Sequence, residues 1–199
     1  MGAISKGDVT ETKTYERADS GVYAARCIQV VELGTHDNEY KGEVKQRKEL
    51  MIVWELAELM QDGRPFTVNW RGTNSLNEKS GLYKMLVGWR GKAFTPQELA
   101  KFELKNILDK LCMVNVTKET SKAGKEYNKM VSVMPLPKGM TVPERANELV
   151  DFGINDMDDK ELFALLWPWV QNIVKDSKEG KAYFEGIHDV DPEEEGEAF

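Results

Sequence analysis

A short apolar segment, Leu50 to Leu56, constrains the fold more than any other part of this 199-residue chain. Six of its seven residues are apolar, and a short run of this kind is typical of a buried strand. Downstream, apolar and polar residues alternate from Phe66 to Arg71, which predicts a strand with one apolar face. Upstream, the composition of Val22 to Leu33 favours a long strand that ends at Gly34 and a polar loop over 35–44. The first part of the chain therefore predicts three consecutive strands.

Two helical signals follow these strands. Ser75 and Glu78 fit a capping box, and apolar residues then repeat at three- and four-residue spacing up to Trp89. Thr95 and the proline after it predict the start of a second helix that runs to about Leu108.

The remaining chain returns to strands and then to helices. Strand composition in 111–117 and 127–134, with a glycine-containing turn between them, predicts a hairpin. Helical patterns follow at 144–150 and 159–174, and Pro168 is expected to bend the second of these.

This order predicts a mainly β fold with helical additions. Five short strands, with a helical insert between the third and the fourth and helices at the C-terminus, match the Greek-key barrel called the OB-fold. A sheet with helices on one face is the alternative. We expect a flexible N-terminal arm (1–20), a barrel domain (21–140), a helical extension packed on or next to the barrel (141–186) and a disordered acidic tail (187–199).

The charge of the chain is divided by position. The formal net charge is −7, but six acids and no Lys or Arg lie between Asp189 and Phe199, so residues 1–188 carry only −1. From Lys41 to Lys129 there are 17 Lys and Arg against 11 Asp and Glu. A basic middle and an acidic end suggest a body that binds a polyanion and a separate interaction tail, although charge runs are also ordinary solvated surface.

No motif in the chain predicts catalysis. His36 and His188 are the two histidines and neither lies in a metal-ligand pattern, so we expect no metal site, no cofactor and no catalytic residue. Glu43 and Lys45, together with Asp37, could suggest a metal-dependent nuclease. They lie on a predicted loop, however, whereas such chemistry needs carboxylates held on a rigid sheet.

The apolar segments also bear on the compartment. The longest uninterrupted run, 163–170, falls far short of the ~20 residues of a membrane-spanning helix, and no signal segment opens the chain. Cys27 and Cys112 lie far apart, as expected for small buried residues in a reducing compartment. We therefore expect a soluble, cytoplasmic protein.

Aromatic and cationic residues are interleaved through the basic middle. Proteins that hold single-stranded nucleic acid combine a positive groove for the phosphates with aromatic rings on which the bases stack. In an OB-fold the loops between strands one and two and between strands four and five grip the strand, and 40–48 and 119–127 are predicted to be these loops. We expect contacts from Tyr40, Lys41, Lys45, Arg47, Lys48, Trp70, Arg71, Lys122, Lys125 and Tyr127. Trp54 and Trp89 are instead expected in the core, because each lies among apolar neighbours at core spacing.

The C-terminus carries the sharpest feature of the sequence. A chain of unpaired acids with an apolar tip suits docking into a basic pocket with a hydrophobic floor, so we expect a partner-binding tail, with a solubilising tail as the alternative. Its expected contact residues are Asp189, Asp191, Glu193, Glu194, Glu195, Glu197 and Phe199.

These features resemble those of a known family. The ending is similar to that of bacterial and phage single-stranded-DNA-binding proteins, which finish in an acidic segment with a terminal Phe. The stretch 34–56, with Leu-Gly-Thr, Tyr-Lys-Gly and Arg-Lys-Glu-Leu-Met-Ile-Val-Trp-Glu-Leu, resembles the first half of a family of bacteriophage OB-fold single-stranded-DNA-binding proteins, as do 73–80 and 89–95. One departure is the last dipeptide, Ala198-Phe199, because bacterial tails generally end Pro-Phe.

The resemblance implies sequence-independent coating of single-stranded DNA in phage replication or recombination, in the cytoplasm of the host cell. It also implies that the tail recruits phage or host replication and recombination proteins. Two rivals remain: an OB-fold interaction or structural protein that binds no nucleic acid, and a metal-dependent nuclease.

Overall fold

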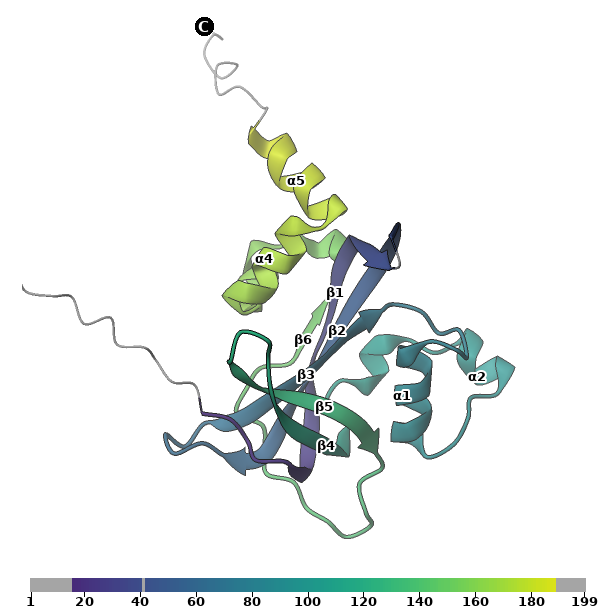
Figure 1. Cartoon of the computed structure of the whole chain (residues 1–199). Coiled ribbons are helices and arrows are strands. Elements are labelled where there is room, and N and C mark those ends of the chain that lie inside the picture. Colours follow the sequence, from purple (N-terminus) through teal and green to yellow (C-terminus); the bar gives the residue numbers. More distant parts are fainter. Residues whose placement is uncertain (1–15, 41, 189–199) are drawn as a thin grey trace, which may run out of the picture.

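A curved β-sheet organises the molecule, as the computed structural model of residues 16–40 and 42–188 shows (Figure 1). Its strands are β1 (Gly21–Tyr40), β2 (Glu43–Leu59), β3 (Pro65–Thr73), β4 (Leu111–Thr120), β5 (Glu126–Met134) and β6 (Val150–Phe152). The order is β3-β2-β1-β4-β5 with antiparallel neighbours, and β6 pairs in parallel with β1. The predicted mainly β class is confirmed, with β6 as an added strand.

Strand β1 bends because its pairing with β2 shifts register twice. The shifts lie between Cys27 and Gln29 and between Glu32 and Gly34. The segment before the first shift pairs with β4, and the segment after it pairs with β6. Bulges of this kind bend a strand and increase its twist. The sheet curves so far that β3 and β5, the two ends of the strand order, come into contact.

Two groups of helices flank the sheet. Between β3 and β4 lie α1 (Gly81–Arg90), α2 (Pro96–Ala100) and the 3-10 helix η1 (Leu104–Ile107). After β6 come the 3-10 helix η2 (Ile154–Asp156), α3 (Lys160–Leu165), α4 (Pro168–Asp176) and α5 (Lys178–His188). Figure 1 shows α1 and α2 on one side of the sheet and α4 and α5 at the other end of the molecule. Among the described residues, no helix is long and apolar enough to cross a membrane.

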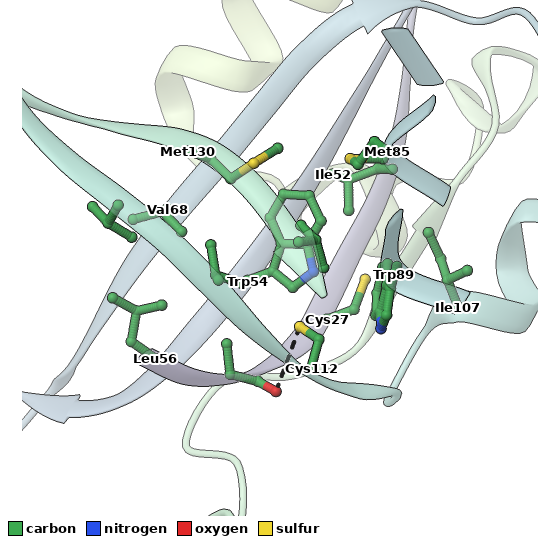
Figure 2. Packing of buried hydrophobic residues seen from close by; sticks show 14 of the residues in the cluster. Cys27, Ile52, Trp54, Leu56, Val68, Met85, Trp89, Ile107, Cys112 and Met130 are labelled. Atoms are coloured by element: carbon green, nitrogen blue, oxygen red, sulfur yellow. Dashed lines mark hydrogen bonds between the residues drawn. The ribbon is translucent and has the colours of Figure 1, made fainter. Parts of the chain in front are cut away.

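The first core fills the concave side of the sheet. Trp54 and Trp89 lie in it with ring centroids 5.8 Å apart, and both are buried, so their predicted core role is confirmed (Figure 2). Cys27 and Cys112 are free and buried in the same cluster, and burial raises the pKa of both thiols. Ala18 also belongs to this core, and its backbone N–H donates to Asn128 of β5, so this part of the predicted N-terminal arm lies against the sheet.

A second core lies on the outer face of β1 and β2. Alternate residues of β2 point to opposite cores: Ile52 and Trp54 into the first, Met51 and Val53 into the second. Phe152 of β6 and Val170 of α4 cover the second core from outside. The continuous apolar run in β2 therefore reflects a strand that is buried on both faces.

Several predicted element boundaries are wrong. The segment 35–44 belongs largely to strands, because β1 and β2 continue past the sheet as a paired hairpin. The segment 144–150 contains no helix: the chain bends at Ala146 and Asn147, where the Glu55 carboxylate of β2 accepts hydrogen bonds from both backbone N–H groups.

The helix termini differ from the sequence prediction in three places. Ser80 caps α1, with its hydroxyl accepting from the Tyr83 N–H, and Ser75 instead takes part in the preceding turn. The Thr95 capping box is confirmed, but α2 is short and a 3-10 helix follows it. Pro168 separates α3 from α4, because its ring cannot donate the backbone hydrogen bond that a continuous helix needs.

Candidate nucleic-acid interface

The candidate interface is built around the part of the β1–β2 hairpin that projects beyond the sheet. We call residues 34–40 and 43–49 the outer hairpin. Their pairing runs without a shift from Gly34 opposite Glu49 to Tyr40 opposite Glu43. Directly paired residues of a hairpin share a face and successive residues alternate between faces. The register therefore divides the predicted contact residues between two faces.

One face of the outer hairpin is held by α5, and we call it the helix face. The Glu179 carboxylate accepts hydrogen bonds from the backbone N–H of Thr35 (2.7 Å) and from its Oγ1 (2.6 Å). Lys178 forms an ion pair with Asp37 at 3.2 Å. Lys48 pairs with Thr35 and so lies on this face, where its charge contributes to a lowered pKa of Glu179.

The opposite face carries the cations that α5 leaves uncovered, and we call it the open face. Lys45 and Arg47 occupy it, opposite Asn38 and His36, and both cations are exposed. Lys45 forms an exposed ion pair with Glu43 at 2.9 Å. Within residues 16–40 and 42–188, no acidic side chain forms an ion pair with Arg47. Arg47 is therefore available to an external anion.

Glu49 ties a third cation to the open face. Its carboxylate accepts hydrogen bonds from Asn38 Nδ2 (2.8 Å) and from Arg71 Nε (2.5 Å). Burial alone would raise the pKa of Glu49, but these two hydrogen bonds outweigh it and the pKa is lowered. Arg71 of β3 is thereby held at the base of the outer hairpin with its side chain 41% exposed.

Trp70 lies on the other face of β3 from Arg71. Its ring packs half-buried against the first core and runs close across Gly72, where an added Cβ would come within 2.4 Å of the ring. This packing explains why glycine occupies position 72. Part of the Trp70 ring remains exposed. Trp70 combines a core role with a surface next to the outer hairpin's base.

The remaining predicted residues gather on the β4–β5 hairpin. Lys122 and Lys125 lie exposed in its turn, and Tyr127 is 40% exposed. The Tyr127 hydroxyl donates to Glu119 Oε2 at 2.9 Å, which raises the pKa of the tyrosine, and Lys129 also binds the same carboxylate. The ring of Tyr127 is thus fixed at its hydroxyl end.

The two groups of candidates lie at opposite ends of β2. Glu16 accepts from the Gln61 N–H just beyond the end of β2, and its neighbour Arg17 donates to the carbonyl of Glu126 at the start of β5. These bonds place the β4–β5 turn at the β2–β3 end of the sheet, away from the outer hairpin. Among the described residues, no hydrogen bond, ion pair or ring contact joins the two groups.

Some expected contact residues lie outside what the structure describes. These are Lys41, the tail from Asp189 to Phe199, and the side chain of Tyr40, whose backbone ends β1. Sequence reasoning missed Asn38 and Glu49. The local sequence gives no signal for them, because 34–49 is polar almost throughout and the pairing of β1 with β2 brings Asn38 and Glu49 together.

The geometry also bears on the nuclease alternative. Asp37 and Glu43 lie on opposite faces of the outer hairpin, because Asp37 pairs with Gln46 and Glu43 pairs with Tyr40. Their carboxylates therefore do not converge. Within the described ranges, no group of three potential metal ligands is present.

The chain was compared with protein-family models, with curated proteins and with solved structures, and none of them matches it.

Proposed function

We propose that this protein binds single-stranded DNA without sequence preference and that the open face of the outer hairpin supplies its main phosphate contacts. The observation that carries the proposal is the grouping of Lys45, Arg47 and Arg71 on one exposed surface at the rim of the sheet. Such a group of cations suits an unpaired strand, since its phosphates bind positive charge.

The architecture supports a barrel of the OB type. Strand order β3-β2-β1-β4-β5, contact between β3 and β5, a bulged β1 and a helix between β3 and β4 are all features of a five-stranded Greek-key barrel. Such barrels bind oligonucleotides across the β2–β3 side. Arg71 and Trp70 belong to β3 and lie at the base of the outer hairpin, on opposite faces of the strand.

The distribution of the candidates suggests a path for a long strand. The open face would hold one part of the DNA, and Lys122, Lys125 and Tyr127 at the other end of β2 would contact another part. Lys48 is reassigned: on the helix face its ammonium lies near Glu179, where it supports the hairpin and does not meet the DNA.

The test is a titration of fluorescein-labelled oligo-dT with the full-length protein, followed by fluorescence anisotropy at several salt concentrations. Binding at low salt that weakens steeply as salt rises is expected, because phosphate contacts release counterions. The double substitution Lys45→Glu and Arg47→Glu should weaken binding at low salt by at least about tenfold and flatten the salt dependence.

The double substitution Lys122→Glu and Lys125→Glu makes the same charge reversal on the β4–β5 hairpin and is compared with the outer-hairpin variant. A loss as large as that of the outer-hairpin variant would assign both ends of β2 to the interface, and a small loss would restrict it to the open face. Competition with unlabelled RNA and duplex DNA measures selectivity for unpaired DNA. No binding at low salt, or binding that salt leaves unchanged, would refute the proposal and favour a protein-interaction role.

We further propose that the protein acts in phage replication or recombination and that the tail recruits the proteins of that process. The acids of the tail and the aromatic ring of Phe199 support this, since they suit a basic pocket with an apolar floor.

A further inference from the structure

A small apolar pocket lies beside α1, on a part of the molecule that the proposed DNA interface does not use. Its volume is about 190 Å³. The floor is apolar, with Trp89 and Leu86 from α1 and Ile107 from η1. The remaining lining residues are Arg90, Phe102, Asn106 and Lys110. An apolar cavity of about 150 Å³ accommodates benzene, so this pocket has room for one aromatic ring.

The polar lining of the pocket is cationic and incompletely satisfied. Arg90 donates through Nη2 to Glu98 at 2.7 Å and stacks on Phe94, with its guanidinium carbon 3.9 Å from the ring centre. Its other terminal nitrogen, Nη1, is buried and has no hydrogen-bond partner among the described residues. An unpaired buried donor is costly, so the site favours an acceptor that would enter with a ligand.

Lys110 adds a second charge at the mouth of the pocket. It is exposed, and within the described part of the chain its ammonium forms no ion pair. The pocket thus combines an apolar floor with two cationic side chains, the partly exposed Arg90 with its buried Nη1 and the exposed Lys110. A ligand that matches it has an aromatic ring, a carboxylate next to that ring and further negative charge behind.

We propose that the pocket binds the acidic segment 189–199 of a second copy of this chain, with the Phe199 ring on the apolar floor and the carboxylates that precede it meeting Arg90 and Lys110. The eleven residues from 189 end in this aromatic residue and carry six acids and no Lys or Arg. The aromatic ring of this segment therefore matches the apolar floor of the pocket, and its acids match the cations Arg90 and Lys110.

The placement of α5 favours a tail from another copy. Figure 1 shows α5 leading the chain away from the side of the sheet that bears α1 and α2. Eleven residues span at most ~40 Å when fully extended. A tail that returned to its own pocket would have to fold back across α4 and the sheet, whereas the tail of a neighbouring copy approaches from outside.

Such a contact is head-to-tail, since a tail on one copy binds a different surface on the next. Contacts of this kind do not close on themselves unless a ring forms, so they build open chains. The proposal therefore predicts self-association that grows with concentration and needs no DNA.

Sedimentation velocity of the full-length protein over a wide concentration range tests this. Wild-type protein should form dimers and larger species. Phe199→Ala removes the ring from the tail, and the pair Asn106→Glu and Lys110→Glu reverses the charge at the mouth through two exposed residues that the first core does not need. Each variant should weaken association by at least about tenfold, since a buried aromatic ring contributes at least one decade in affinity.

Mixing the two variants gives the decisive measurement. The Phe199→Ala copy retains its pocket and the charge-reversed copy retains its tail, so the mixture should form dimers and nothing larger. Lys84→Glu, on the exposed side of the same helix α1, is the matched control and should associate like wild type.

The proposal would be overturned if the wild-type protein stayed monomeric, or if the charge-reversed protein still associated through its tail. It would also be overturned if the mixture formed no dimers, because the tail would then bind the pocket of its own copy. Because no DNA is present, these failures are separate from a failure of the proposed DNA binding.

Discussion

The carboxylate of Glu179 accepts two hydrogen bonds from Thr35, one from the backbone N–H at 2.7 Å and one from Oγ1 at 2.6 Å. This contact fastens the outer hairpin to the first turn of α5, the helix that leads into the tail. The pKa of Glu179 is lowered even though burial acts to raise it, because the two hydrogen bonds favour the charged form. The outer hairpin is therefore joined directly to the start of α5.

Glu179→Ala should release the outer hairpin from α5. Because hydrogen bonds to a charged acceptor are lost, the free energy of unfolding should fall by roughly 1–2 kcal/mol, measured by urea denaturation. Hydrogen exchange at the Thr35 amide should become faster. Lys178→Ala removes the exposed ion pair with Asp37 and is the control; a loss equal to that of Glu179→Ala would contradict this account.

Gly34→Ala should destabilise the protein through two separable effects. Gly34 has φ +84°, which strains any L-residue with a side chain, and an added Cβ would lie 2.5 Å from both Cβ and Oγ of Ser177. Gly42 has a similar φ of +80° but open space around it, so Gly42→Ala isolates the backbone strain. Gly42→Ala should cost about 1 kcal/mol and Gly34→Ala clearly more. Equal losses would show that Ser177 yields to the added methyl group.

Arg47 and Lys48 are neighbours in β2 that the register sends to opposite faces. If the open face binds phosphate, Arg47→Ala should weaken binding of oligo-dT several-fold at low salt and reduce the slope of log affinity against log salt by about one. Lys48→Ala should change affinity by less than about twofold, because its charge lies beside Glu179. Equal losses in the anisotropy titration would contradict the assignment of faces.

Glu98 makes the stability of the α2 region depend on pH. A hydrogen bond from the Thr95 backbone N–H and another from Arg90 lower the pKa of Glu98 to about 2, from an ordinary value of 4.5. Because the folded-state pKa is depressed, the stabilisation is complete above the ordinary value and is lost as pH falls toward 2. The difference in urea midpoint between wild type and Glu98→Gln should therefore be present at pH 7 and shrink below pH 4.5. A difference that stays constant down to pH 2 would argue against this carboxylate as its source.

Local patterns predicted the elements whose own residues carry the signal. The alternation in 66–71 became β3, and the capping box at Thr95 starts α2 as expected. The core positions of Trp54 and Trp89 followed from their apolar neighbours. In each case the side chains that fix the element lie within a few residues of one another.

The outer hairpin could not be recognised from its residues. Positions 35–44 are polar, and polar residues with turn formers between apolar runs are typical of a loop. They form strands because β1 and β2 pair with each other and because Glu179, far along the chain, binds Thr35. A stabilising partner more than a hundred residues away leaves no periodic signal in the segment itself.

The same limit applies to the candidate interface. Its cations could be listed from the sequence, but Arg47 and Lys48 lie on opposite faces through a register that follows the shift between Glu32 and Gly34. The separation of the β4–β5 turn from the outer hairpin depends on how far the sheet curves. That curvature follows from the register shifts in β1 and from packing in the first core.

By itself, the sequence determined the strand-rich class of this protein, its helical insert, most of its core and the uneven spread of its charge, because these depend on residue type and short spacing. Tertiary structure decided which charges share a surface, that a polar segment forms strands, and where Arg90 meets an apolar pocket, because each of these depends on the packing of segments that are distant in the chain.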